Sequence, residues 1–187
     1  MDKKELRSVM KANKEKMTTL DICRESRPVI DKVIASPEFN AADAIYIYME
    51  YNQEVITHAI MTQAWEQGKR VAVPKVFNKT MDFYYIESFD DVVPGYMGIL
   101  EPIEYFKAKE EKALVIMPGL AFDRDFNRIG YGGGFYDGFF ATHASADFTK
   151  MALCYDFQIV DHIETEPHDY RVDVIVTPNN LYRRSEL

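Results

Sequence analysis

A glycine-rich stretch between Arg128 and Asp137 carries residue types that could bind a phosphate chain. Four glycines fall within residues 130–134. Because glycine has no Cβ, the backbone there can turn several N–H groups toward one anion and let it approach closely. The spacing matches neither of the common phosphate loops, GxxxxGK[ST] and GxGxxG. The alternative is a tight structural turn, but Arg128 before the glycines and Asp137 after them favour a phosphate site.

The flanking sequence would place this stretch between a strand and a helix. Residues 113–117 form a short apolar run, typical of a strand buried on both faces, which Pro118 and Gly119 end. After the glycines, the aromatic residues at positions 135, 136, 139 and 140 have helical spacing. The loop would therefore lead into a helix N-terminus, where the partial positive charge favours anions.

The segment from Met117 to Asp137, MPGLAFDRDFNRIGYGGGFYD, resembles the signature segment of the 5-formyltetrahydrofolate cyclo-ligases, also called 5,10-methenyltetrahydrofolate synthetases. Weaker matches extend the resemblance from Lys3 to Asp173. It implies an ATP- and Mg²⁺-dependent conversion of 5-formyltetrahydrofolate, with or without a polyglutamate tail, into 5,10-methenyltetrahydrofolate, with ADP and phosphate as products. Phe135 stands where family members often have tyrosine, so one hydroxyl of the aromatic pair is missing.

The opening segment, MDKKELRSVMKANKEKM, predicts a helix with one apolar face and many basic residues off it. From the residues alone, a solvated basic face is the simpler interpretation. The resemblance includes KKELR, and it implies that this helix and the glycine stretch bind the phosphates of ATP together. The residues that it assigns to ATP are Lys3, Lys4, Arg7, Arg128, Gly130, Gly132, Gly133, Gly134, Phe135 and Tyr136.

Glu54 follows an expected strand at residues 44–49, at the edge where open α/β sheets bind ligands. A first-turn glutamate favoured by the helix dipole is the alternative interpretation. The pattern YxxEVxT resembles the family segment whose glutamate holds the formyl and pterin end of the folate. Glu101 lies in the segment MGILEPIE, which resembles the GxxEP turn of the family, although a solvated acidic loop also explains it. The resemblance implies that the residues binding the folate are Tyr51, Glu54, Glu101 and Tyr131. It implies that the catalytic residues are Glu54, Arg128 and Tyr136.

Asp173 lies among aliphatic residues of an expected strand at residues 172–176. An ionised carboxylate in such a place needs a cation or hydrogen bonds. The resemblance implies that Asp137 and Asp173 together hold Mg²⁺, which generally accepts one or two carboxylates plus substrate phosphates.

The alternation of apolar strands with amphipathic helices predicts a three-layer α/β/α sandwich with a mainly parallel central sheet. Further strands are expected at residues 70–74, 113–117 and 150–154, with an antiparallel one nearer an edge at 81–86. A second helix should begin with a capping box at Thr18 and Asp21, and Pro28 should kink it or split it. A helix near residues 55–64 should end at Gly68, and residues 182–187 should be a short tail.

Composition limits the remaining possibilities. The 187 residues are 47% hydrophobic, which suits a single domain spanning residues 1–187, and the net charge of −8 argues against a general nucleic-acid binder. Two cysteines give neither a disulfide framework nor zinc spacing, so both are expected to be buried thiols in a reducing compartment. From the apolar pattern of the chain, we expect neither a signal peptide nor a membrane-spanning run. We therefore expect a cytoplasmic monomer whose partners are ATP and the folate, with no nucleic acid and no membrane.

Two other classes of function remain open at this point. One is a folate-binding or nucleotide-sensing module that kept the pocket but lost turnover. The other is an unrelated ATP-dependent kinase or ligase with a similar loop. The joint presence of basic, acidic and glycine motifs favours the cyclo-ligase.

Overall fold

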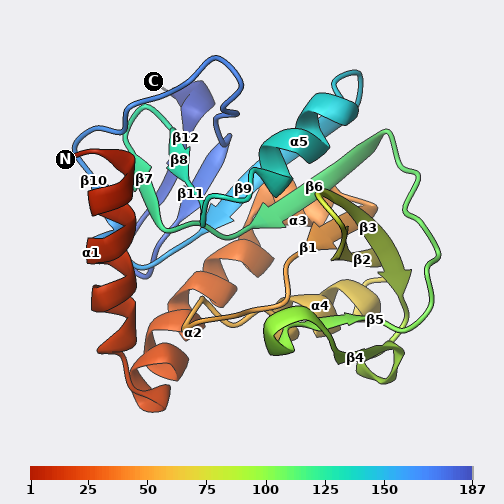
Figure 1. Cartoon of the computed structure of the whole chain (residues 1–187). Helices are drawn as coiled ribbons and strands as arrows, with labels where there is room; N and C mark the ends of the chain where they lie inside the picture. Colours follow the sequence, from red (N-terminus) through yellow and green to blue (C-terminus); the bar gives the residue numbers. More distant parts are fainter. Residues whose placement is uncertain (187) are drawn as a thin grey trace.

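A mainly parallel sheet forms the centre of the molecule (Figure 1). Within residues 1–186, which the computed structural model describes, this sheet has seven strands in the order β12-β11-β9-β6-β1-β2-β3. The five strands from β11 to β2 run parallel, and the outermost strands β12 and β3 are antiparallel to their neighbours. The strands are β1 (Ala44–Ile47), β2 (Arg70–Phe77), β3 (Thr80–Ile86), β6 (Lys112–Met117), β9 (Asp147–Leu153), β11 (Val174–Val176) and β12 (Leu181–Arg183).

Helices cover both faces of this sheet, because its central strands are apolar on both sides. On one face, α2 (Thr19–Ala35), α3 (Pro37–Ala41) and α4 (His58–Glu66) pack against Ile45, Ile47 and their neighbours. On the other face, α5 (Phe135–Thr142) packs its phenylalanines against Tyr46 and Val115. Figure 1 shows α5 above the sheet, with α2 and α4 below it. The predicted three-layer arrangement with a mainly parallel sheet is confirmed.

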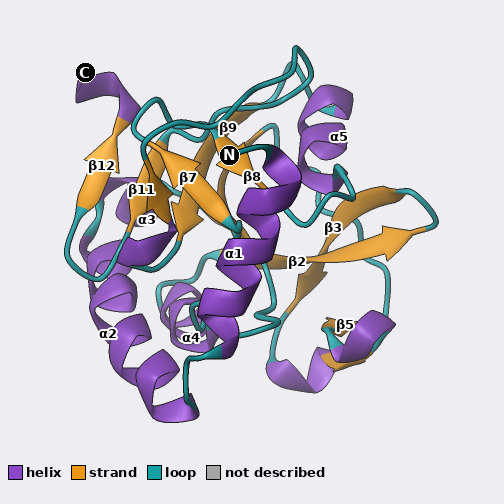
Figure 2. Cartoon of the chain, turned by 60° about the vertical axis from the view of Figure 1, so that its left-hand side comes forward, coloured by secondary structure: helices purple, strands orange, loops and turns teal. Residues whose placement is uncertain are grey.

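The basic N-terminal helix, α1 (Lys3–Glu15), lies beside the sheet rather than on it. Its apolar residues Leu6 and Met10 pack against Leu120, Ile129 and other residues around a small second sheet. That sheet consists of β7 (Ala121–Asp123), β8 (Arg128–Ile129) and β10 (Ile159–Val160). Figure 2 shows α1 running in front of β7 and β8. The basic face of the helix is thereby brought next to the glycine loop that follows β8.

The shorter elements complete the chain at the edges of the sheet. Strands β4 (Val92–Pro94) and β5 (Leu100–Pro102) form a hairpin that contacts β2. Short 3-10 turns are η1 (Phe89–Asp91), η2 (Tyr96–Gly98), η3 (Asp156–Gln158) and η4 (Arg184–Glu186). None of the helices described over residues 1–186 is long and apolar enough to cross a bilayer.

Several local predictions are confirmed and others are wrong. The capping box at Thr18 begins α2, and Gly68, with φ of 74°, follows the end of α4. Pro28 does not split α2, because a proline removes only one helical donor while the buried stripe of this helix stays packed on the sheet. The expected tail forms β12 and η4 up to residue 186, and Leu187 lies outside the described residues. Cys154 is buried as expected, whereas Cys23 is exposed.

Asp123 anchors the turn that connects β7 and β8. Its two carboxylate oxygens accept hydrogen bonds from the backbone N–H groups of Asp125, Asn127 and Ile163 and from the side-chain amide of Asn127, at 2.9–3.1 Å. The residue is only 1% exposed. We expect Asp123→Ala to lower the free energy of unfolding by about 3 kcal/mol, because it leaves several donors without an acceptor. Urea denaturation would measure this, with the exposed Asp125→Ala as a control that should unfold like the parent protein.

Candidate active site

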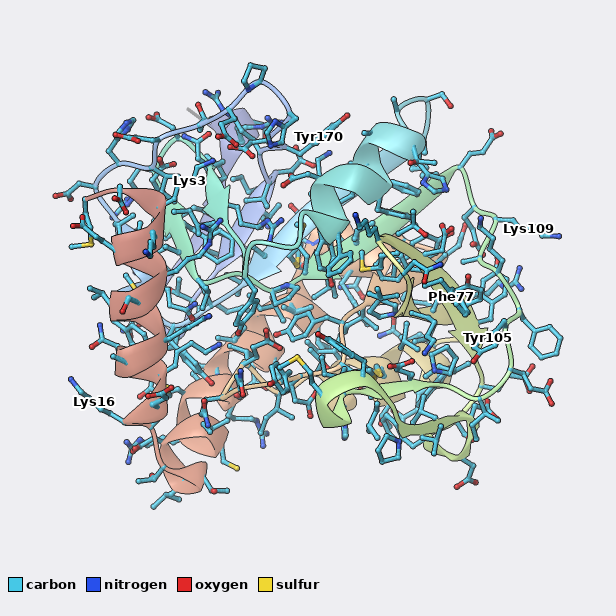
Figure 3. The ribbon with its side chains drawn as sticks, viewed as in Figure 1. Lys3, Lys16, Phe77, Tyr105, Lys109 and Tyr170 are labelled. Carbon is cyan, nitrogen blue, oxygen red and sulfur yellow. The ribbon has the colours of Figure 1, made fainter. Side chains whose placement is uncertain are left out.

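A cavity of about 340 Å³ lies between α1, the glycine loop and the N-terminus of α5. It brings together the basic residues Lys3, Arg7 and Arg128 from two distant parts of the sequence. In Figure 3, Lys3 lies at the upper end of α1, and Tyr170 lies on the loop near α5. The complete lining comprises Lys3, Arg7, Pro118, residues 128–137, Glu166, His168 and Asp169.

The glycine loop has a backbone shape that side chains would disfavour. Gly132 and Gly134 adopt φ angles of 108° and 67°, in the left-handed region. Gly134 is also the N-cap of α5, and no side chain caps the first turn of that helix. The free N–H groups of this turn, together with the helix dipole, therefore face the cavity in the manner of an anion site. Arg7 fixes the loop to α1, because its Nε donates to the carbonyl oxygen of Gly130 at 2.9 Å.

Arg128 places a buried positive charge at the floor of the cavity. Its side chain is 7% exposed, and its Nη2 lies 3.9 Å from Oδ2 of Asp137. Its Nη1 donates to the carbonyl oxygen of Pro118 at 3.4 Å, and its guanidinium carbon lies 5.4 Å from the centre of the Tyr136 ring. Burial lowers the pKa of this guanidinium and Asp137 opposes the effect, yet arginine remains charged. Since both polar contacts are long, the guanidinium can still bind an incoming anion strongly.

Acidic residues hold Lys3 in this structure. Its Nζ lies 2.8 Å from Oδ2 of Asp169 and 3.5 Å from Oε2 of Glu166. His168 lies on the same segment, with its Nε2 3.2 Å from Glu166. A phosphate group that engages Lys3 would therefore have to replace these carboxylates as the partner of the ammonium.

Glu54 is presented by a tight turn after β1. Asn52 and Gln53 both have positive φ, at 46° and 59°, and the N–H of Glu54 donates to the carbonyl oxygen of Tyr51 at 3.2 Å. Two successive left-handed residues without glycine are strained, and such strain concentrates at functional sites. The turn folds the Glu54 side chain back, so that its Oε2 accepts from the N–H of Tyr51 at 2.7 Å.

The Glu54 carboxylate is buried and linked to α1. Its Oε1 accepts from the hydroxyl of Tyr131 at 3.2 Å, and the same hydroxyl accepts from Nζ of Lys14 at 2.8 Å. Burial raises the pKa of Glu54 to about 7, and the charge of Lys14 and the two hydrogen bonds to the carboxylate limit this rise. Near neutral pH this group can therefore both hold and accept a proton.

Asp137 is a carboxylate of the cavity lining that fits a magnesium ion, whereas Asp169 and Glu166 of the same lining pair with Lys3. Its Oδ1 accepts from the backbone N–H of Tyr170 at 3.0 Å, while the contact of Oδ2 within the described part of the chain is the long one with Arg128. Mg²⁺ usually keeps several waters and takes one or two carboxylates plus substrate phosphates. One fixed carboxylate beside a phosphate site meets that requirement.

The sequence model of the 5-formyltetrahydrofolate cyclo-ligase family matches residues 1–178. The chain belongs to this family. A probable 5-formyltetrahydrofolate cyclo-ligase of Schizosaccharomyces pombe is 28% identical, with 98% of each chain covered. The mitochondrial 5-formyltetrahydrofolate cyclo-ligase of Arabidopsis thaliana is also 28% identical, over 96% of this chain and 75% of the relative. The solved 5,10-methenyltetrahydrofolate synthetase of Aquifex aeolicus superimposes with a TM-score of 0.85, at 28% identity, over 98% of this chain and 93% of that one.

The protein is thus an enzyme of the cyclo-ligase family, and most of its expected ATP residues meet in one cavity. Lys4 is the exception, because it is exposed on α1 and does not line the cavity. Tyr51 is half-buried at the Glu54 turn, and Tyr131 is both in the cavity lining and bonded to Glu54. Their roles in this cyclo-ligase remain predictions.

Four further expected residues do not line the cavity, namely Tyr51, Glu54, Glu101 and Asp173, although Glu54 is bonded to Tyr131 of the lining. Glu101 forms an ion pair with Lys75 and accepts from the N–H of Tyr96 at 2.6 Å, so it attaches the β4–β5 hairpin to β2. Asp173 accepts from the N–H of Lys150 at 2.8 Å and pairs with Arg184 at 2.5 Å. Its charge is compensated, as the sequence requires, but by the protein's own cations. The pairing of Asp173 with Asp137 around one metal ion is therefore not formed in this structure.

Sequence reasoning did not single out Lys14, although a signal for it exists. At 100° per residue, positions 3, 7 and 14 lie within about 40° of one another around a helix. Lys14 therefore shares a face with Lys3 and Arg7, two residues that the family resemblance did identify. A helical projection of α1 would have shown that this lysine points toward the site rather than toward solvent.

Proposed function

We propose that this protein converts 5-formyltetrahydrofolate into 5,10-methenyltetrahydrofolate in a reaction that consumes ATP, requires Mg²⁺ and releases ADP and phosphate. Family membership supports the folate activity. The observation that carries the nucleotide part is the cavity in which Lys3, Arg7 and Arg128 face the uncapped N-terminus of α5. This combination of cations and free N–H groups suits a triphosphate.

The reaction requires activation of the formamide oxygen of the substrate, which is otherwise a poor leaving group. The formamide oxygen of the substrate attacks the γ-phosphorus of ATP, and the bond from this phosphorus to the bridging oxygen of ADP breaks. The nitrogen at position 10 then attacks the activated formyl carbon. That attack closes the ring, and loss of the proton from the nitrogen and departure of phosphate, with the electron pair of the carbon–oxygen bond, then give the methenyl form. No covalent bond to the protein is needed.

The protein would contribute mainly position and charge. Lys3, Arg7, Arg128 and the backbone of residues 130–134 would hold the phosphates, with Phe135 and Tyr136 beside them and Lys4 as an outer contact. Asp137 would hold Mg²⁺, which supplies charge neutralisation on the phosphate oxygens when bound. Asp173 would have to release Arg184 and Lys150 to become a second ligand, so that role remains a prediction.

Glu54 would act at the folate end of the site. In its ionised form it would orient the substrate and take the proton that nitrogen 10 loses on ring closure. A carboxylate whose pKa lies near 7 suits that task, because it is a sufficient base and a substantial fraction of it is ionised at neutral pH. Tyr51 and Tyr131 would flank the folate there, and Glu101 would have to act through the position of the hairpin.

A coupled assay tests the proposed function. The methenyl chromophore should appear only when protein, ATP, Mg²⁺ and 5-formyltetrahydrofolate are all present. Binding of the folate without turnover would identify a non-catalytic module. Consumption of ATP with other acceptors but not with this folate would identify an unrelated kinase or ligase.

The cytoplasm and the monomeric state are part of the same proposal. Both cysteines are free, which agrees with a reducing compartment. The Arabidopsis thaliana relative is named as mitochondrial, so members of this family also work elsewhere. Light scattering of the purified protein, with and without ATP, would determine the oligomeric state.

A further inference from the structure

The feature of the site that the proposed mechanism does not use is the buried cation Lys14. It is 2% exposed, whereas Lys3 and Arg7 on the same face of α1 are partly exposed. Taking an ammonium out of water is costly unless a partner compensates it. Its Nζ donates at 2.8 Å to a neutral hydroxyl, that of Tyr131, and the acidic group beyond this hydroxyl is Glu54.

The direction of the hydrogen bonds follows from what each group can donate. An ammonium has donors and no acceptor, so the Tyr131 oxygen must accept from Lys14. The single hydroxyl proton of Tyr131 is then available for Oε1 of Glu54, 3.2 Å away. Burial, with a contribution from Glu54, raises the pKa of Tyr131 and keeps this hydroxyl protonated. Bonding to a cation polarises the hydroxyl and makes it a better donor to the carboxylate.

We propose that Lys14 is a positioning residue that acts through the Tyr131 hydroxyl to hold Glu54 ionised and correctly oriented toward the folate. This inference rests on the proposed function of Glu54. The second oxygen of the carboxylate is fixed by the N–H of Tyr51 at 2.7 Å, so the relay from Lys14 completes its orientation. Lys14 itself touches neither substrate nor nucleotide in this scheme.

The other groups around Glu54 cannot replace Lys14. Besides Lys14, Tyr131 and the N–H of Tyr51, the described groups that interact with its charge include Tyr48, Glu50, Tyr136 and Tyr155. None of these is a cation, and Glu50 adds a second negative charge. Without Lys14, burial and Glu50 would both act to raise the pKa of Glu54 further.

The first test compares three variants of α1 by their pH profiles. In Lys14→Met, the acidic limb of kcat/KM for 5-formyltetrahydrofolate should move up by about one pH unit or more, while KM for ATP stays near the parent value. Lys14→Arg should restore the parent profile, because it keeps the cation. Lys11→Met is the matched control, since Lys11 lies 5.7 Å from the centre of the same Tyr131 ring but is exposed. Its profile should not change.

Tyr131→Phe tests the same inference if Lys14→Met fails to fold. This change removes only the hydroxyl that connects Lys14 to Glu54, and it should move the acidic limb in the same direction. If the acidic limb of the kcat/KM profile does not move in folded Lys14→Met or in Tyr131→Phe, the inference is wrong.

An infrared titration of the protein without ligands separates this inference from the proposed function. The Glu54 carboxyl band is identified by its absence in Glu54→Gln, and its midpoint is followed with pH. The midpoint should rise in Lys14→Met and stay constant in Lys11→Met. If the parent protein makes no methenyl product but the midpoint rises, the proposed function fails and the relay stands; an unchanged midpoint would refute the relay itself.

Discussion

Replacing Glu54 with glutamine is expected to lower kcat for methenyltetrahydrofolate formation by about 10³-fold, with the affinity for ATP unchanged. Glutamine has nearly the same shape, and its amide oxygen can still accept from the N–H of Tyr51. It cannot take a proton from nitrogen 10, and it carries no charge to face the Tyr131 hydroxyl. Product absorbance would measure the rate, and calorimetry with a non-hydrolysable ATP analogue would measure the nucleotide affinity.

Glu50→Gln is the matched control for this substitution. Glu50 lies four residues earlier, but its carboxylate accepts from the hydroxyl of Thr57 at 2.8 Å and faces His58 at 3.2 Å. Its loss should leave most of the activity. An effect of Glu54→Gln confined to nucleotide affinity would contradict the role proposed for this residue.

The pH dependence of the parent protein follows from the same group. Burial raises the pKa of Glu54 to about 7, so the carboxyl becomes protonated as the pH falls below neutrality. A protonated carboxyl cannot accept the proton from nitrogen 10. We therefore expect kcat/KM for the folate to fall about tenfold for each pH unit below about 6.5. Glu54→Gln should lack this limb in a pH series from acid to neutral.

The layers of the fold could be predicted because they depend on local pattern. Residues 113–117 are apolar throughout, and the burial of β6 from Ala113 to Met117 agrees with that pattern. The order of the strands and the structure of the C-terminal residues depend instead on contacts with residues far away in the sequence. Arg183 pairs with Glu38 at 2.6 Å, and Arg184 pairs with Asp173, so residues 181–186 are held against the sheet by contacts that no local window contains.

The candidate site also combines residues that a local motif identifies with residues whose contacts depend on distant parts of the chain. The glycine loop, Arg128 and Asp137 lie within ten consecutive residues, so one motif identifies them together. For Asp173, the sequence predicts correctly that a cation or hydrogen bonds are needed but cannot say that Arg184 and Lys150 supply them. Lys14 was missed because its link to Glu54 joins residues 40 positions apart through a third residue. The single-domain organisation expected from length remains a prediction.

Replacing Asp137 with asparagine is expected to lower kcat by about 10²- to 10³-fold while the free energy of unfolding changes by less than about 2 kcal/mol. The asparagine oxygen can still accept from the N–H of Tyr170, which preserves the local structure. The contact with Arg128 is 3.9 Å long, so its loss removes little stability. The negative charge that would hold Mg²⁺ is lost, and the apparent affinity for this ion should fall with it. Activity titrated against Mg²⁺ concentration, together with urea denaturation of the ligand-free protein, would measure both effects.

Asp173→Asn provides the informative comparison, because this carboxylate contacts Arg184 and Lys150 rather than the cavity. Its loss should reduce the stability of the C-terminal strand pair and leave the Mg²⁺ dependence of the rate unchanged. If Asp173→Asn weakens the apparent Mg²⁺ affinity as much as Asp137→Asn does, then Asp173 must leave its cations and join Asp137 when nucleotide binds, as the family resemblance implies. If instead Asp137→Asn alone unfolds the ligand-free protein, Asp137 supports the fold and the metal assignment fails. The two single variants therefore decide whether one or two carboxylates of this chain hold the ion.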